Sequence, residues 1–352
     1  MITITSGLSQ CHFTSDVPDV SFAIDGTHAT VCVALMSGQD ATLVYDERLY
    51  PMNGIIMLRS LGLLLEGYIR QTLVRDVEIR ITEYNGDEEL SSKTLSTSLV
   101  YCAADLGMPA DEFCNTHFLT ILNGERTTAY GRLEYLHYIG TDEIKVRVYY
   151  SDGSTTDHTA DAVSGNDKYK TVDVSPYHFI DESKKGLALR YTVSAGERSQ
   201  TYVLDRRCPD CAPILIFDNS FGCEELLYCT GTHTVAPSYT RNNVWIDHKL
   251  RNYKIEEQRK FKADTGILSF PMANWADELF RSDRVHLVNI YDGEPTVGKE
   301  VLITDSKSEY TNDDDTLPRF TFEYIYSQRI HNVIDLKRVG RIFDNTFDNT
   351  FE

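Results

Sequence analysis

The chain has 352 residues, of which 41% are hydrophobic and 25% are charged, the composition of a folded globular protein. It is longer than one ordinary hydrophobic core requires, so we expect two or three domains. The net charge of −19 at pH 7 repels a phosphate backbone and argues against nucleic acid as a main partner. The 21 Tyr and 15 Phe residues, against 2 Trp, favour β-sheets, where such side chains fit a pleated surface.

Residues 1–105 are predicted to form an N-terminal β domain with one short helix. Apolar and polar residues alternate over 19–34 around an Asp-Gly-Thr turn, which is the pattern of a hairpin. Alternation returns over 41–45 and over 76–83, where an Asn-Gly-Asp turn leads into a further strand. The helix is predicted from apolar residues at helical spacing, namely Leu58, Leu61, Leu64, Leu65 and Tyr68.

Residues 106–213 are predicted to form a middle β-sandwich. The pattern is weak at first, and residues 108–113 fit either a short helix or a linker. Short strands then recur at a spacing typical of a sandwich, over 132–138, 144–150, 172–174, 186–193 and 201–204. We expect that the sheet of this sandwich can continue into the strand that begins at Ile214.

Residues 214–352 are predicted to form a C-terminal β-rich domain with one helix and a terminal arm. Residues 214–231 read as a strand, an Asp-Asn-Ser turn and a returning strand, followed by a long polar strand-like segment. Pro271 suits the first turn of a helix over 271–281, whose apolar face is Met272, Trp275, Ala276, Leu279 and Phe280. Further strands are predicted over 285–290, 299–305 and 319–326.

The last ten residues, 343–352, fit either a frayed tail or an arm that becomes ordered on another subunit. In the second reading Phe343, Phe347 and Phe351, four residues apart, anchor one helical face. The predicted fold class is thus mainly β, with several antiparallel β-sandwich or barrel units and a few short helices.

The N-terminus and the apolar runs indicate where the chain is made. Residues 1–5 contain neither the basic nor the apolar part of a signal peptide. The longest apolar runs, such as 61–65, are far shorter than the roughly 20 residues that a membrane span needs. We therefore expect no membrane span, synthesis in the cytoplasm, and cysteines that stay reduced there.

Two groups of residues have the chemistry of metal ligands. Cys208 and Cys211 are spaced as zinc ligands, and Cys223 with Cys229 can supply a second pair, although at an unusual spacing. We expect reduced, unliganded thiols, with zinc and a disulfide as alternatives. The acidic run Asp313–Asp315 lacks the spacing of a calcium loop, so a solvated hairpin tip is expected there. No catalytic, cofactor-binding or metal-binding residue is predicted.

The chain resembles tail-module structural proteins, of the adaptor or baseplate type, from phages and prophages of gut anaerobes. The resemblance is carried by residues 45–68 and by blocks at 217–224, 230–231, 261–266, 275–282 and 301–307. It implies a virion component made in the host bacterial cytoplasm, one that forms ring-like homo-oligomers and contacts neighbouring tail or baseplate proteins. It carries over no catalytic residues.

The expected function is therefore that of a non-enzymatic assembly protein. The alternative is a carbohydrate-binding or glycan-processing β-sandwich module, with a glycan as its partner. The sequence has only Trp245 and Trp275 to form a sugar-stacking platform, although Tyr can substitute.

Overall fold

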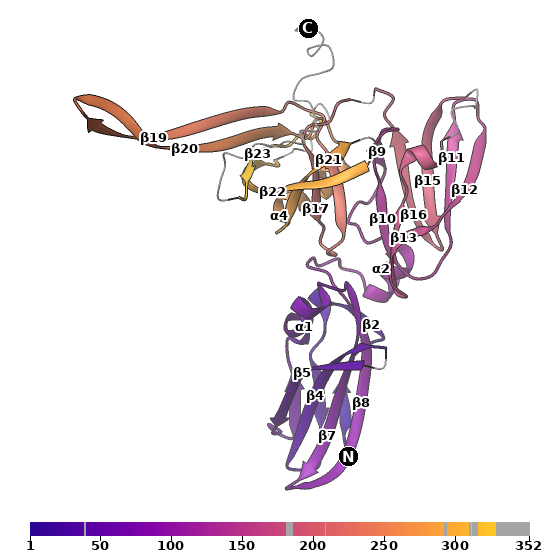
Figure 1. Cartoon of the computed structure of the whole chain (residues 1–352). Helices are drawn as coiled ribbons and strands as arrows, with labels where there is room; N and C mark the ends of the chain where they lie inside the picture. Colours follow the sequence, from indigo (N-terminus) through magenta and orange to yellow (C-terminus); the bar gives the residue numbers. More distant parts are fainter. Residues whose placement is uncertain are drawn as a thin grey trace.

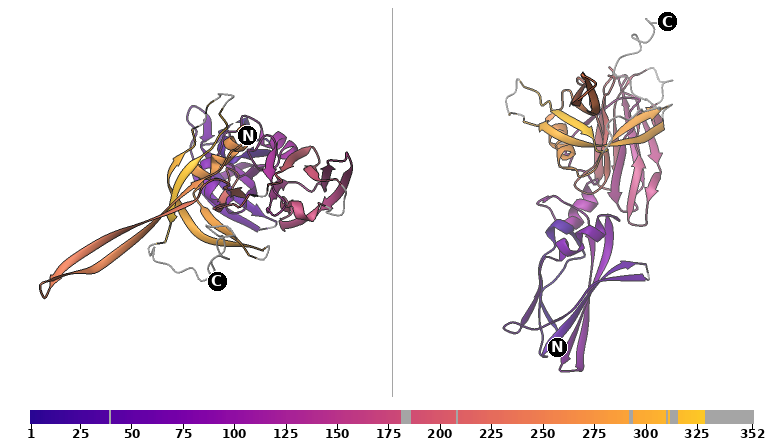
Figure 2. Two further views of the ribbon diagram at one scale, coloured as in Figure 1. Left: turned by 90° about the horizontal axis from the view of Figure 1, so that it is seen from above. Right: turned by 60° about the vertical axis from the view of Figure 1, so that its left-hand side comes forward.

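The computed structural model describes residues 1–38, 40–180, 186–207, 209–291, 294–309, 311 and 316–328. The fold is mainly β, with 54% strand and 11% helix, so the predicted fold class is confirmed. Its sheets form three groups, and the N-terminal group lies at one end of an elongated molecule (Figure 1). The other two groups lie side by side at the opposite end, from which a long hairpin projects (Figures 1 and 2).

The N-terminal group is a sandwich of two sheets with strand orders β1-β3-β6 and β2-β8-β7-β4-β5. Alternating inward side chains of both sheets, such as Phe22, Val33 and Ile79, share one core. The strands are β1 (Thr3–Ser6), β2 (Cys11–Phe13), β3 (Val20–Ala23), β4 (His28–Ser37), β5 (Asp40–Leu49), β6 (Ile55–Leu58), β7 (Val74–Asn85) and β8 (Glu88–Val100).

The predicted hairpin over 19–34 is wrong, because β3 and β4 belong to opposite sheets of this sandwich. Both strands send alternate apolar residues into the shared core, so they have the alternation of a hairpin without pairing. The crossing at Asp25 and Gly26 is held by Glu83, whose carboxylate accepts both backbone N–H groups at 2.7 Å. The predicted pair after Asp76 is confirmed, with β7 and β8 joined in antiparallel register.

The middle group is also a two-sheet sandwich, with orders β12-β11-β15-β16-β9 and β10-β14-β13. Val148 and Tyr191 of the larger sheet pack with Tyr138 of the smaller one. The strands are β9 (Arg126–Thr128), β10 (Tyr135–Ile139), β11 (Ile144–Tyr150), β12 (Thr155–Ala160), β13 (Ala162–Gly165), β14 (Tyr169–Asp173), β15 (Ala188–Ala195) and β16 (Arg198–Leu204).

The C-terminal group is one sheet with the order β18-β17-β21-β22-β23-β20-β19. Its strands are β17 (Ile214–Asp218), β18 (Glu224–Tyr228), β19 (Thr234–Ile246), β20 (Lys249–Asp264), β21 (Val285–Tyr291), β22 (Glu294–Lys307) and β23 (Thr321–Tyr326). β17 pairs with β18 and β21, so the expected continuation of the middle sheet into Ile214 is wrong. The predicted strand-turn-strand over 214–231 is confirmed.

The helices differ from the predictions in their limits. The first, α1 (Leu61–Ile69), begins after Leu58, which lies in β6, and its Leu64 and Tyr68 are exposed. Residues 108–113, left open between helix and linker, contribute to α2 (Ala110–Thr116). The helix predicted over 271–281 is divided at Asp277 into α3 (Phe270–Ala276) and α4 (Glu278–Arg281).

One aromatic cluster joins the three groups of sheets. Phe13 of β2, Phe113 of α2 and Phe221 of the β17–β18 turn are buried against one another. Their ring centroids are 5.7 Å apart for Phe13–Phe113, 5.1 Å for Phe113–Phe221 and 6.0 Å for Phe13–Phe221. Aromatic pairs at this spacing add packing energy beyond their buried area, so the cluster positions the N-terminal sandwich under the other two groups.

Candidate functional site

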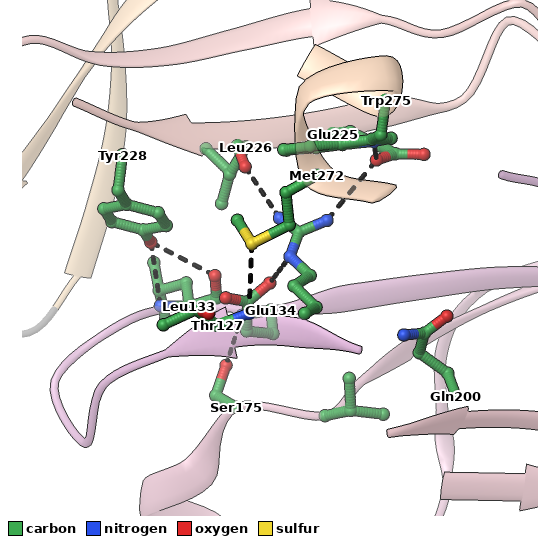
Figure 3. Close-up of polar contacts among 12 residues, drawn as sticks. Thr127, Leu133, Glu134, Ser175, Gln200, Glu225, Leu226, Tyr228, Met272 and Trp275 are labelled. Atoms are coloured by element: carbon green, nitrogen blue, oxygen red, sulfur yellow. Dashed lines mark hydrogen bonds and ion pairs between the residues drawn. The ribbon is translucent and has the colours of Figure 1, made fainter. Parts of the chain in front are cut away.

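The richest cluster of buried charges lies between the middle sandwich and the C-terminal sheet. Arg126 of β9 meets Glu134, which precedes β10, and Glu225 of β18. Glu134 and Glu225 are labelled in Figure 3, together with Trp275. The Arg126 Nε atom lies 2.9 Å from Glu134, and Nη1 lies 3.4 Å from Glu225. All three side chains are at most 8% exposed. Because an unpaired buried charge is costly, this pairing ties the two groups together.

Trp275 of α3 closes the cluster from the other side. The Arg126 guanidinium lies 4.3 Å from the Trp275 ring centroid, and the indole N–H donates to Glu225. Arg126 also donates to the carbonyl of Leu226 at 2.7 Å. Burial alone would lower the pKa of Arg126, but the two carboxylates outweigh it and raise that pKa above its ordinary value. The arginine therefore remains charged at every pH at which the protein folds.

The adjoining cavity decides what this cluster can do chemically. Two carboxylates near one point are the machinery of glycoside hydrolysis. The cavity beside Arg126 and Glu225 has a volume of about 10 Å³, and Phe118, Leu122 and Tyr202 contribute to its lining. That volume holds at most about one water molecule, so a sugar ring cannot enter. We therefore infer that the cluster holds the middle sandwich and the C-terminal sheet together.

Glu278 is a third buried carboxyl at this junction. One of its oxygens accepts the Ser220 N–H at 2.9 Å, and its side chain is packed near Glu225. Burial, together with the Glu225 charge, raises the pKa of Glu278 from 4.5 to about 7. Between these two values the folded protein holds a proton that the unfolded chain has released, so stability falls as pH rises through this window.

Replacing Glu278 by glutamine should therefore remove part of the pH dependence. From pH 5 to pH 8 the variant should gain about 3 kcal/mol relative to the wild type, since one pKa unit is worth about 1.4 kcal/mol. Urea unfolding at both pH values, followed by Trp275 fluorescence in a Trp245→Phe background, measures the difference. Parallel losses of stability in the two proteins would show that Glu278 is not protonated in the fold.

Cys223 and Cys229, the pair considered as additional metal ligands, do not come together at one point. Cys223 and Cys229 flank β18 at its two ends, about 20 Å apart along an extended strand, whereas sulfurs on one zinc ion lie within about 5 Å. Burial raises the pKa of both thiols, which disfavours the thiolate that a metal needs. Cys211 is a free, half-buried thiol. Cys208 lies outside the described residues, as do Asp313–Asp315 and the C-terminal residues 343–352.

The most exposed element of the described chain is the hairpin of β19 and β20, called the arm below (Figures 1 and 2). Its two strands pair from Thr234↔Lys262 to Ile246↔Lys249. β20 pairs with β23 only over Phe261–Asp264, so the outer part projects without a neighbouring strand. The twelve residues of β20 before this pairing, 249–260, extend about 40 Å, which is the approximate reach of the arm beyond the sheet.

The arm ends in a two-residue turn at Asp247 and His248, whose φ angles are 51° and 57°. Positive φ at both positions is the geometry of a type I′ turn, which matches the twist of a hairpin. From the sequence, this segment is predicted only as long, polar and strand-like. The hairpin is not predicted there because Asp-His lacks the glycine that normally marks such a turn.

Large apolar side chains lie exposed over the outer arm. Trp245 is 71% exposed, Tyr253 67% and Leu250 55%, and Tyr239, Val244, Ile246 and Ile255 are exposed as well. The register places Trp245 opposite Leu250 on one face, while Val244 and Ile246 lie on the other face beside Arg251 and Lys249. An isolated two-stranded hairpin is marginally stable in water. Exposed apolar surface of this kind marks an interaction site.

The comparisons with known proteins assign no family. No known family matches the chain, and no curated protein is detectably similar to it. Within the described residues no helix is long and apolar enough to cross a membrane.

Proposed function

We propose that the protein is a non-enzymatic assembly component of a phage tail or tail-like particle, which uses the arm to contact copies of itself and neighbouring tail proteins. The arm is the observation that carries this proposal. It exposes both faces and both strand edges, together with seven large apolar side chains. A free strand edge pairs with other chains, and a protein that acts alone normally covers it.

The charge of the arm supports the same function. Residues 234–264 contain seven Lys and Arg against four Asp and Glu, a net charge of +3 in a chain of net charge −19. A basic, apolar projection on an acidic protein is attracted to acidic protein surfaces, including that of its own kind. The proposal places the protein in the virion, after synthesis in the host bacterial cytoplasm.

Shortening the arm tests this function. We expect a variant in which Asn-Gly replaces residues 240–256 to keep the melting temperature of the wild type, because the deleted side chains lie outside the hydrophobic cores. It should lose the self-association of the wild type, measured as mass by light scattering at matched concentrations. A wild-type protein that stays monomeric at high concentration would refute the assembly function.

One observation favours a glycan-binding module as the second candidate. The outer face of β11, β12 and β15 has an open groove of about 890 Å³, to whose lining Arg147, Tyr149, Asp157 and Thr192 contribute. Tyr149 supplies one aromatic face and its neighbours supply polar groups, the combination that binds sugars. Binding on a glycan array that is lost in a Tyr149→Ala variant supports this candidate, and an empty array removes it.

A further inference from the structure

Exposed apolar side chains of the described chain are concentrated on two surfaces. Of the 27 large hydrophobic residues that are exposed, 15 lie within residues 43–68 and 239–255. The second range is the outer arm. The first, called the acceptor surface below, comprises β5, β6 and α1 of the N-terminal sandwich and exposes Leu43, Tyr50, Met52, Ile55, Met57, Leu63, Leu64 and Tyr68.

The acceptor surface also has unpaired backbone groups. β5 is the last strand of one sheet of the N-terminal sandwich, and β6 is the last strand of the other. In the described part of the chain these two strands therefore have free edges, and β6 leads directly into the short helix α1. Leu63 is 76% exposed and Tyr68 is 52% exposed on this helix, although its other face is buried in the core. Free edges beside apolar side chains accept an added strand or hairpin.

The charges of the two surfaces are complementary. Residues 239–255 of the arm contain Arg241, Lys249, Arg251 and Lys254 against Asp247 alone. The acceptor region, residues 40–68, contains four acidic and two basic residues, and its Asp46 and Glu47 are exposed. Opposite charges around apolar centres steer association and set the partner.

We infer that the arm of one copy docks on the β5–β6–α1 acceptor surface of a second copy of this chain. The inference rests on the proposed function and names the partner and its surface. Trp245 and Leu250, which share one face of the arm, pack against the exposed side chains of α1, while Lys249 and Arg251 on the opposite face attract the arm to the acidic acceptor region. Because donor and acceptor are different parts of the chain, repeating the contact builds a reciprocal dimer, a closed ring or an open filament.

Two variants separate the two halves of this contact. The arm variant carries Trp245→Ser and Leu250→Ser, and the acceptor variant carries Leu63→Ser and Tyr68→Ser. All four side chains are exposed, so both variants should fold, as circular dichroism and melting temperature will show. Each should raise the dissociation constant of self-association at least tenfold, as loss of interface anchors does. The matched control, Leu187→Ser with Leu189→Ser on the middle sandwich, should leave it unchanged.

Mixing gives the decisive measurement, by sedimentation equilibrium. The acceptor variant retains an intact arm, and the arm variant retains an intact acceptor surface, so an equimolar mixture should form a one-to-one complex that neither forms alone. A mixture that remains monomeric overturns the inference. An acceptor variant that associates like the wild type also overturns it, while leaving the assembly function intact. A monomeric wild type refutes the assembly function itself, so the two failures are distinguishable.

Discussion

Replacing Arg126 by methionine should lower the free energy of unfolding by about 3–5 kcal/mol at neutral pH. Glu134 and Glu225 are both almost fully buried, and Arg126 lies within 3.4 Å of each. Without the guanidinium, two carboxylates remain in a site that excludes water. Each must then be protonated at a cost or repel the other, and the cation–π contact with Trp275 disappears as well.

Urea unfolding, followed by Trp275 fluorescence with Trp245 replaced by phenylalanine, measures this loss. The matched control is Arg147→Met, because Arg147 also pairs with a carboxylate, at 2.7 Å from Asp157, but on an exposed strand. Such a surface pair is screened by water and contributes little to stability. Adding Glu134→Gln and Glu225→Gln to Arg126→Met should recover part of the loss. A cost below about 1 kcal/mol for Arg126→Met would contradict the paired, charged cluster.

The second large effect is expected at Trp275. Its side chain is 1% exposed. Its ring centroid lies 5.8 Å from that of Phe217, and the ring also contacts the Arg126 guanidinium. Trp275→Ala should therefore cost roughly 3–5 kcal/mol through the cavity that it leaves, in addition to the lost hydrogen bond to Glu225. Thermal and urea unfolding by far-ultraviolet circular dichroism measure the loss without depending on the removed fluorophore.

The other tryptophan of the chain is the matched control. Trp245 is 71% exposed on the arm, so Trp245→Ala should change stability by no more than about 0.5 kcal/mol. We expect the opposite ranking for self-association, which Trp245→Ala weakens. Equal losses of stability in the two variants would mean that the arm is packed against the rest of the chain. Because Trp275 and Arg126 touch, their single effects should not add.

Local patterns were sufficient for the fold class and for many of the strands and helices. The alternation after Asp76 indicates a half-buried strand, whichever strand it pairs with. Pro271, followed by apolar residues at helical spacing, indicates a helix whatever the helix packs against. The burial of Trp275 was predictable for the same reason, since the predicted helix has only one apolar face. These features depend only on residues that are close together in the sequence, so the sequence alone is enough to predict them.

Pairing and burial of charge were decided only by the tertiary structure. Alternation cannot show whether β3 joins β4 or faces it across a core, because both arrangements place the same side chains inward. Arg126, Glu134 and Glu225 are about 100 residues apart at their extremes, and nothing near any of them shows that it will be buried. The same holds for α1, where Leu64 and Tyr68 lie on the exposed side although they share the helical spacing of the buried Leu61 and Leu65. The arm is exposed because, in the described chain, no strand lies beside β19 or the outer part of β20. The order of strands in the folded sheet decides this, and no local run of residues shows it.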